Sequence, residues 1–459
     1  MTLIVRNPAT GEVIDELATD TPELVAEKVQ RARAAQRAWA NTPLSERKAA
    51  IARFRDLVAA NRPDLALTLT REMGKPVSQA LNELNALAAR LDFFLGAIDA
   101  ASADELVFRD QSAGMDEVIR HEPLGVVANV SAWNYPWFVG SNVYVPALLT
   151  GNTVVYKPSE HATLSGLSMA RLLHAAGVPS EAFIATVGAG EVGAALVGSP
   201  VDGFFFTGSY GTGRAIAERL GPRLIRTGFE LGGKDPAYVT DDIDLGKAAE
   251  SLADGAMYNT GQSCCAVERI YVQRAVMPAF VNALVEVVRK FELGDPEKPT
   301  TYIGPLAREA QLQVLAEQVS DAVGRGGRLV IGGARAERPG NYFQPTVIAD
   351  ADNTMRLMRE ESFGPVIGIA AVDDDSDAIA QMNDTEYGLT AGVYTRDRSR
   401  AERLLSQIDS GSVYWNCCDR VSPRLPWTGR RHSGLGSTLS TYGIRAFQQP
   451  KAWHLRSPG

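Results

Sequence analysis

The chain has 459 residues, of which 45% are hydrophobic and 22% charged, and its formal net charge is −8. This length is too great for one hydrophobic core, so two or more domains are expected. The acidic balance argues against a nucleic-acid or anionic-membrane partner. No targeting segment is evident, and no run reaches the roughly 18 apolar residues that a membrane span needs. The composition therefore predicts a globular protein of the cytoplasm.

Cysteine and histidine usage favours a reducing compartment and no metal. The four cysteines form two adjacent pairs, Cys264 with Cys265 and Cys417 with Cys418. Neighbouring cysteines make poor structural disulfides, so we expect free thiols. The five histidines are scattered, without Cys or His partners at ligand spacing, and we predict no metal site.

The first hundred residues predict a layer of helices. Thr21 before Pro22 is typical of a helix start, with the threonine as the N-cap. Further helices are expected over residues 44–60, from Pro63, and over 83–97. We expect these helices only to cover a sheet. Apolar residues 106–108 and 118–119 then flank a polar turn at 111–114, which predicts a β-hairpin.

From residue 125 the pattern alternates between strands and helices. Short apolar runs occupy 126–130, 153–156, 183–187, 203–206 and 236–239. This alternation predicts a parallel, Rossmann-like sheet, which binds ligands at the carboxyl ends of its strands. After residue 234 a second α/β domain is expected, with helices at 275–291 and 308–323 and strands at 329–332, 366–372 and 412–415.

Two short stretches carry the chemistry. Residues 259–269 place Cys264 just before an apolar, strand-like run, and residues 229–234 place Glu230 before two glycines. A thiolate nucleophile and a carboxylate base can divide acyl chemistry into two easier steps. Glu230, Cys264 and their spacing resemble the aldehyde dehydrogenase superfamily, and further matches extend the resemblance over nearly the whole chain.

The resemblance implies oxidation of an aldehyde to the carboxylic acid with NAD(P)+. Cys264 would form a thiohemiacetal and then a thioester, and Glu230 would activate the water that hydrolyses it. Asn134, with the backbone N–H of Cys264, would receive the oxyanion. Cys265 is interpreted as a packing neighbour. The chain departs from the family at Ala132, usually proline, and at Val143, where many relatives carry a lysine implicated in proton relay.

The resemblance also implies a nicotinamide cofactor site. Lys157 and Glu160 would hold the adenine ribose, and the Glu160 charge would repel a 2′-phosphate, so NAD is preferred and NADP remains possible. The glycine–serine turn at 208–213 is the phosphate candidate. The G-x-G-x-x-G string at 188–193 follows the third strand rather than the first, so we interpret it mostly as a tight loop. The predicted cofactor residues are Ser131, Trp133, Lys157, Ser159, Glu160, Gly188, Gly208, Ser209, Gly213, Leu231, Glu361 and Phe363.

The expected fold is α/β with three parts. Residues 1–103 and 124–232 would form the Rossmann-like NAD-binding domain, and residues 233–446 a second α/β catalytic domain. Residues 104–123 and 447–459 would form a small β extension that bridges subunits of a homodimer or homotetramer.

Several alternatives remain for the function. Arg420 and Arg424 near the mouth of the site would suit a semialdehyde with a distal carboxylate, whereas Tyr135, Trp137, Phe138 and Trp427 suggest an apolar, aromatic tunnel. Acylating relatives that pass the thioester to coenzyme A typically lack the carboxylate base, so Glu230 argues against that reaction. The remaining alternative is a non-catalytic, NAD-binding scaffold.

Overall fold

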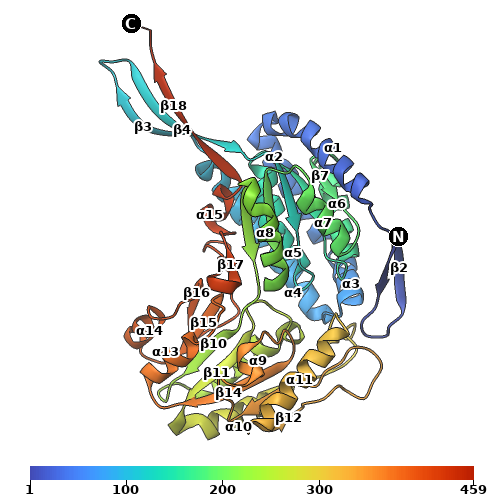
Figure 1. Ribbon diagram of the computed structural model, residues 1–459, viewed down its shortest axis with the longest axis vertical. Helices are drawn as coiled ribbons and strands as arrows, with labels where there is room; N and C mark the ends of the chain where they lie inside the picture. Colours follow the sequence, from blue (N-terminus) through green and yellow to red (C-terminus); the bar gives the residue numbers. More distant parts are fainter. Residues whose placement is uncertain (459) are drawn as a thin grey trace.

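Two sheets, one in each half of the chain, organise the structure. The computed structural model describes residues 1–458. Figure 1 shows the two α/β units one above the other, with a narrow strand extension that projects from the upper unit. This arrangement confirms the predicted α/β class with two sheets and a small β extension. Among the described residues, no helix is long and apolar enough to cross a membrane.

The first sheet has six strands in the order β17-β9-β8-β5-β6-β7, and only β17 is antiparallel to its neighbour. Four of its strands follow the predicted apolar runs. The strand that ends at Glu230, β9, was missed because its sequence, Arg-Thr-Gly-Phe-Glu, holds a single large apolar residue. The strands are β5 (Val126–Val130), β6 (Thr153–Lys157), β7 (Phe183–Ala185), β8 (Gly203–Thr207), β9 (Arg226–Glu230) and β17 (Gly434–Leu435).

Helices cover both faces of this sheet. Val126 and Ala128 of β5 pack in the cluster formed with α1 and α7, whereas Val127 packs in the cluster of α4 and α5. This alternation is what a strand buried on both faces requires. The predicted cap of α1 is confirmed, because the Thr21 side chain accepts the N–H of Leu24. The helices are α1 (Pro22–Asn41), α2 (Leu44–Ala60), α3 (Arg62–Met73), α4 (Val77–Ala101), α5 (Pro136–Leu149), α6 (Thr163–Ala175), α7 (Gly190–Gly198) and α8 (Tyr210–Leu220).

The second sheet has seven strands in the order β12-β13-β14-β11-β10-β15-β16, parallel except for the β12–β13 pair. The apolar run at 236–239 belongs here, as β10, and not to the first sheet. The strands are β10 (Asp235–Val239), β11 (Val267–Gln273), β12 (Arg328–Ile331), β13 (Thr346–Ala349), β14 (Val366–Val372), β15 (Thr390–Tyr394) and β16 (Ser412–Trp415). Its helices are α9 (Leu245–Met257), α10 (Met277–Val288), α11 (Ala310–Gly324), α12 (Arg356–Arg359), α13 (Asp375–Asn383) and α14 (Arg398–Leu405).

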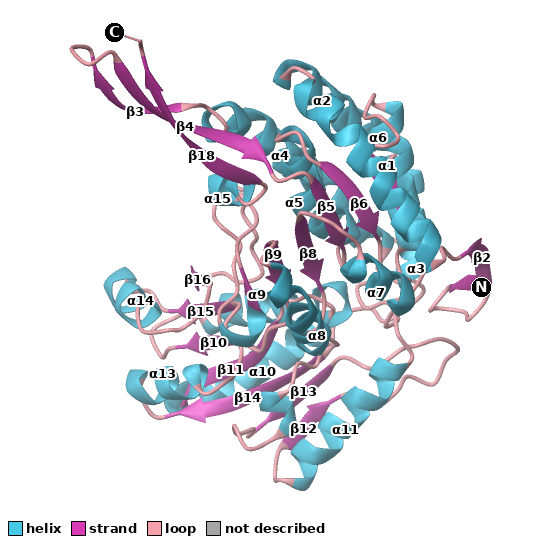
Figure 2. Ribbon diagram, turned by 45° about the horizontal axis from the view of Figure 1, so that its top comes forward, coloured by secondary structure: helices cyan, strands magenta, loops and turns pink. Residues whose placement is uncertain are grey.

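The extension joins two segments that lie far apart in sequence. The predicted hairpin is confirmed as β3 (Glu105–Asp110) and β4 (Met115–Pro123), and β18 (Gln448–Arg456) pairs antiparallel with β4 along its whole length. Figure 2 shows the three strands standing clear of both sheets. The chain reaches β18 through α15 (Ser440–Arg445), which packs on α4. A separate hairpin of β1 (Thr2–Arg6) and β2 (Val13–Ala18) begins the chain.

The chain returns to the first sheet near its end. β17 pairs with β9, so this short strand lies in the first sheet although the predicted division places it in the domain 233–446. The division of the chain at residue 233 remains a prediction. The pairing matters for the site because it places Gly434 directly opposite Glu230 on the neighbouring strand.

Candidate functional site

Cys264 lies in a loop between α9 and β11 that has an unusual backbone. Asn259, Thr260 and Gly261 are all left-handed, with φ of 54°, 59° and 71°. A Cβ on Gly261 would lie 2.2 Å from the carbonyl oxygen of Gly364, so only glycine fits there. Such backbone strain persists only where the surrounding structure enforces it, and it gathers at functional sites.

Buried hydrogen bonds hold this loop in place. The backbone N–H of Asn259 donates to Gln79 Oε1 at 2.8 Å, and Asn259 Nδ2 donates to the carbonyl oxygen of Asn134 at 3.1 Å. Gln262 Oε1 accepts the backbone N–H of Ala307 at 2.9 Å. The loop is thereby tied to α4, to the segment after β5 and to the second unit. These bonds fix Cys264 relative to the rest of the site.

Cys264 and Glu230 line the same cavity, which has a volume of about 520 Å³. Apart from the Cys264 loop, its walls come from α4, α5, α9, the end of β9 and the loop around 419–427. Asn134 is buried but is not among the lining residues. Other side chains in the lining include Arg90, Phe138, Asn142, Asp419, Arg420 and Trp427.

Two threonines orient the Glu230 carboxylate at the end of β9. Thr207 Oγ1 donates to Glu230 Oε2 at 3.4 Å, and the Thr438 hydroxyl donates to Glu230 Oε1. Burial raises the pKa of Glu230, and the Thr438 hydrogen bond and the Arg90 charge oppose that rise. Neither threonine was predicted from the sequence, because Thr207 ends β8, Thr438 follows β17, and both meet Glu230 only in the folded sheet.

The two neighbouring thiols have different surroundings. Cys265 is buried, and its Sγ donates to Asp419 Oδ1 at 3.0 Å. The adjacent Cys264 thiol, burial and the Asp419 charge together raise the pKa of Cys265 well above its ordinary value. Cys264 is partly exposed. A raised pKa keeps Cys265 a neutral thiol, so Cys264 is the better candidate nucleophile.

Helix α4 contributes more to the site than the sequence indicated. Gln79, Glu83 and Arg90 lie on one face of it and line the cavity. Glu83 forms a fully buried ion pair with Lys75 and accepts the backbone N–H of Trp137 at 2.9 Å. The expectation that the first helices only cover the sheet is therefore wrong for α4. The sequence did contain an indication of this role, namely polar residues at helical spacing within an otherwise apolar segment.

The two arginines predicted at the mouth have different positions. Arg420 lines the cavity and is exposed. Arg424 is also exposed, but it is not part of the lining. Both follow Asp419, which adopts a left-handed backbone with φ of 48° and directs this loop across the cavity.

A second cavity, of about 700 Å³, gathers seven of the predicted cofactor residues, namely Ser131, Trp133, Lys157, Ser159, Glu160, Gly208 and Ser209. Ser209 is the N-cap of α8, so the positive end of this helix opens toward the cavity. Lys157 Nζ lies 3.9 Å from Glu160 Oε2. A helix start, a buried lysine and a carboxylate are groups that fit the phosphates and ribose of a dinucleotide.

The other predicted cofactor residues lie outside this lining. Phe363 is brought beside Trp133, with ring centroids 5.4 Å apart in an edge-on contact. Glu361 Oε1 accepts the backbone N–H of Gly233 at 3.1 Å. Gly213 packs directly on Leu231, since a Cβ there would lie 2.6 Å from that side chain. Of these contacts, the one between Phe363 and Trp133 joins the two units.

The glycine string at 188–193 is only partly a loop. Gly188 has φ of +147°, but α7 begins at Gly190, and Gly190 and Gly193 line the second cavity. Gly188 itself is outside the lining. The helix continues to Gly198 because Val192 and Leu196 bury its inner face.

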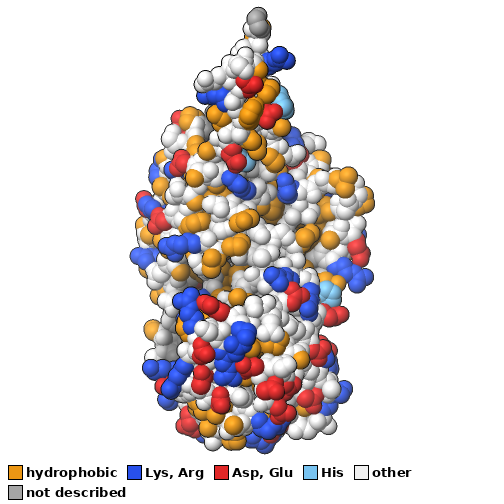
Figure 3. Space-filling view, turned by 90° about the vertical axis from the view of Figure 1, so that its left-hand side faces the viewer, with side chains coloured by type: hydrophobic (Ala, Val, Ile, Leu, Met, Phe, Trp, Pro, Cys, Tyr) orange, Lys and Arg blue, Asp and Glu red, His pale blue; other side chains and the backbone are white. Residues whose placement is uncertain are grey.

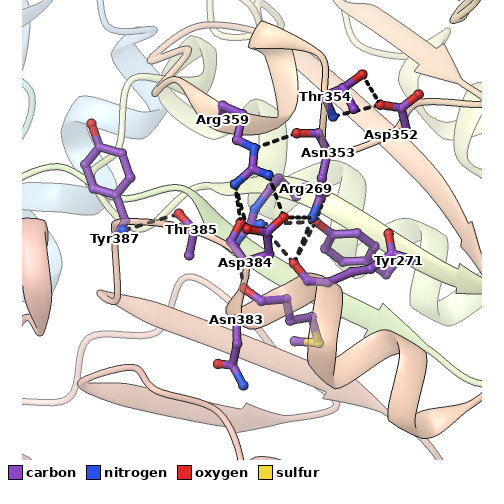
Figure 4. Close-up of polar contacts among 12 residues, drawn as sticks. Arg269, Tyr271, Asp352, Asn353, Thr354, Arg359, Asn383, Asp384, Thr385 and Tyr387 are labelled. Atoms are coloured by element: carbon purple, nitrogen blue, oxygen red, sulfur yellow. Dashed lines mark hydrogen bonds and ion pairs between the residues drawn. The ribbon is translucent and has the colours of Figure 1, made fainter.

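Arg269, five residues beyond Cys264, has a structural role. It is fully buried, and its Nε donates to the carbonyl oxygen of Lys234 at 2.8 Å while Nη2 donates to that of Met382 at 3.0 Å. Figure 4 shows it beside Tyr271, within a polar network that includes Asn353 and the ion pair of Arg359 with Asp384. This network joins β11 to α13 and supports the strand that follows Cys264.

Comparison with known proteins identifies the family. Residues 1–453 match the model of the aldehyde dehydrogenase family. A betaine aldehyde dehydrogenase of Cereibacter sphaeroides is 37% identical over 97% of this chain and 92% of its own length. An NADP(+) succinate-semialdehyde dehydrogenase of Deinococcus radiodurans is 34% identical over 97% of this chain and 93% of its own. An indole-3-acetaldehyde dehydrogenase of P. syringae, solved with NAD+, superposes with a TM-score of 0.96 at 32% identity, covering 99% of this chain and 93% of that one. The chain therefore belongs to the aldehyde dehydrogenase family and is an NAD(P)-dependent aldehyde dehydrogenase.

Proposed function

We propose that Cys264 is the nucleophile and Glu230 the general base of a hydrolytic aldehyde dehydrogenase. The observation that carries this proposal is their shared cavity, in which Cys264 is open to substrate and Cys265 is bound to Asp419. Glu230 supplies the carboxylate that a hydrolytic reaction needs and that transfer to coenzyme A does not. A scaffold that only binds the cofactor has no need of this strained and fixed thiol loop.

The reaction follows from these assignments. The Cys264 thiolate adds to the carbonyl carbon, and the new oxyanion is stabilised by the backbone N–H of Cys264 and the Asn134 amide. Bound NAD(P)+ supplies the acceptor for the hydride that leaves this carbon, and Cys264 then carries a thioester. Glu230 removes a proton from water, which attacks the thioester; the C–S bond breaks, and the acid and the thiolate are released. In sum, aldehyde, NAD(P)+ and water give carboxylate, NAD(P)H and two protons.

Position 143, beside Glu230, is a valine in this chain and not the lysine that is implicated in proton relay in many relatives. Val143 lines a small space with Thr207, Glu230 and Thr438. The two threonine hydroxyls, both bonded to Glu230, hold its carboxylate in place.

The proposed cofactor is NAD, with NADP as a poorer alternative. Lys157, Ser159 and Glu160 would hold the adenine ribose, and Gly208, Ser209 and the start of α8 the phosphates. Ser131, Trp133, Gly188, Gly213 and Leu231 would shape the remaining wall, and Glu361 and Phe363 would close on the nicotinamide half. Ser159 Oγ donates to Glu160 Oε2 at 3.3 Å, which orients the carboxylate in advance.

Replacing Glu160 with serine is expected to shift cofactor use toward NADP. Losing charge-assisted hydrogen bonds to the ribose costs about 1.5–3 kcal/mol, so NAD should bind more weakly. The change also removes repulsion of the 2′-phosphate, while Lys157, Arg219 and Arg308 still line the cavity. The measurement is the ratio of kcat/KM for NAD and NADP at one aldehyde concentration. Glu218→Ser, an exposed carboxylate on α8, is the matched control.

A parent enzyme that already prefers NADP would contradict this assignment, because another contact would then outweigh Glu160. An unchanged ratio in Glu160→Ser would mean that its carboxylate does not face the ribose.

We further propose that the chain forms a homo-oligomer through its β extension. Strand β3 is one of the two edges of the three-stranded sheet and exposes Leu106, Val107 and Phe108. Figure 3, which looks onto this side, shows hydrophobic side chains gathered below the extension and charged ones concentrated lower down. An apolar edge strand is suited to pair with another copy of the chain. Light scattering should give a molar mass of two or four times 49.3 kDa, and a monomer would contradict the proposal.

The proposed reaction is tested by its stoichiometry. Aliphatic, aromatic and ω-carboxy aldehydes should be supplied with NAD and NADP, and reduced cofactor and acid measured together. We expect equal amounts of both, without coenzyme A. A requirement for coenzyme A, with an acyl thioester as product, would overturn the hydrolytic assignment. The three relatives described above are named for a cationic, an anionic and an uncharged aldehyde, so their names leave the charge of this substrate open.

A further inference from the structure

Arg90 is a buried cation in the cavity that forms or breaks no bond in the proposed reaction, although its charge lowers the pKa of Glu230. Its side chain is only 4% exposed, yet it lines the cavity together with Cys264 and Glu230. Its Nη1 donates to Asn142 Oδ1 at 2.7 Å, and the guanidinium carbon lies 4.1 Å from the centroid of the Phe138 ring. These two contacts hold the guanidinium plane in one orientation.

Among residues 1–458, no carboxylate forms an ion pair with Arg90. The nearby acidic side chains already have partners: Glu83 is paired with Lys75, Asp419 accepts from Cys265, and Asp254 accepts from Tyr302 at 2.5 Å. Burial lowers the pKa of Arg90 to about 10, and Glu230 and Glu83 oppose this only through their charge. An arginine with this pKa is still charged at neutral pH. A buried guanidinium that forms no ion pair is costly, so its retention favours an anionic ligand.

We propose that Arg90 anchors the distal anionic group of the substrate, so that this enzyme oxidises a short aldehyde carrying a carboxylate at its other end. This inference rests on the proposed function, because it requires the aldehyde end to reach Cys264 in the same cavity. A guanidinium presents parallel N–H groups that match the two oxygens of a carboxylate. Phe138 and Trp427 would pack on the carbon chain between the two ends.

Arg90 fits this task better than the two arginines first considered. Arg424 is outside the cavity lining, and Arg420 is exposed, so water screens its charge. The buried position of Arg90 also disfavours a cationic aldehyde, which would bring a second positive charge into the cavity. The inference therefore predicts that the substrate of this chain differs in charge from betaine aldehyde.

The first test compares two aldehydes of the same shape. The probes are 4-oxobutanoate and 4-methylpentanal, in which an uncharged isopropyl group replaces the carboxylate. The parent enzyme should prefer 4-oxobutanoate. Arg90→Met should lower the ratio of kcat/KM for 4-oxobutanoate to that for 4-methylpentanal by roughly 10–150-fold, the effect of losing hydrogen bonds to a charged group. The ratio is the readout because loss of the Arg90 charge also raises the pKa of Glu230, which affects both aldehydes alike. Arg90→Lys should restore part of the loss, and Arg420→Gln should have the smaller effect.

The second test does not depend on turnover. Succinate carries a carboxylate at both ends and should slow the alkylation of Cys264 by iodoacetamide in the parent but not in Arg90→Met. Thermal unfolding and NAD binding of each variant report on the fold.

The outcomes separate the inference from the proposed function. Equal losses for both aldehydes in Arg90→Met would overturn the inference, because Arg90 would then act through Glu230 or the fold. A parent that prefers 4-methylpentanal and is not protected by succinate would overturn it as well, while leaving the hydrolytic function intact. Failure of the parent to oxidise any aldehyde would contradict the proposed function, and succinate protection would still decide the role of Arg90.

Discussion

Replacing Cys264 with serine should abolish aldehyde oxidation while leaving NAD binding intact. Without the thiolate, neither the thiohemiacetal nor the thioester forms, and loss of a covalent nucleophile lowers kcat by about 10³-fold or more. NAD binding should persist because Cys264 is not part of the lining of the second cavity. The measurements are the rate of NADH formation and the binding of NAD to the same preparation.

Cys265→Ser is the matched control, and it should keep most of the activity. Cys265 is buried and bonded to Asp419, so it is positioned for packing and not for attack. Comparable losses in both variants would mean that the two thiols act together or that the wrong one has been assigned. Alkylation offers an independent check, since an enzyme should show one fast-reacting thiol and a scaffold should show none.

Several parts of the fold were predictable because local and tertiary preferences agree in them. The strands β5, β14 and β16 begin and end at the predicted residues, since continuous or alternating apolar runs are bounded there by polar residues, glycine or proline. Helix α2 follows its prediction for the same reason. Strand β9 was not predictable, because its five residues gain their place from pairing with β8 and β17 and not from their own pattern.

The candidate site likewise contains residues that were predictable from the sequence and residues that were not. Cys264, Glu230 and the seven residues of the second cavity lie where strand ends and helix starts carry short motifs. Thr438 and Arg90 lie elsewhere in the sequence and have no motif. Thr438 reaches Glu230 across 208 positions of the chain, and Arg90 enters the cavity on one face of a long helix. Contacts of this kind depend on packing between distant segments, which a single sequence does not reveal.

Glu230→Gln should separate the two halves of the reaction. Hydride transfer does not need the base, so one equivalent of NADH per active site should appear rapidly. Hydrolysis does need it, and loss of a general base slows that step by about 10²–10⁴-fold. A stoichiometric burst should therefore precede a much slower steady state, and mass spectrometry should find the acyl group on Cys264. Turnover like that of the parent would show that the base assignment is wrong.

The pH dependence of hydrolysis provides a second test of the Glu230 assignment. Only the ionised carboxylate accepts a proton from water, and burial raises the pKa of Glu230, so hydrolysis should increase with pH up to and through this raised value. Glu230→Gln should lose this acid limb. Thr438→Val should keep it but move it to higher pH, because the Thr438 hydroxyl stabilises the ionised form and lowers the pKa. An acid limb that stays in place in both variants would assign it to another group and remove Glu230 from the hydrolytic step.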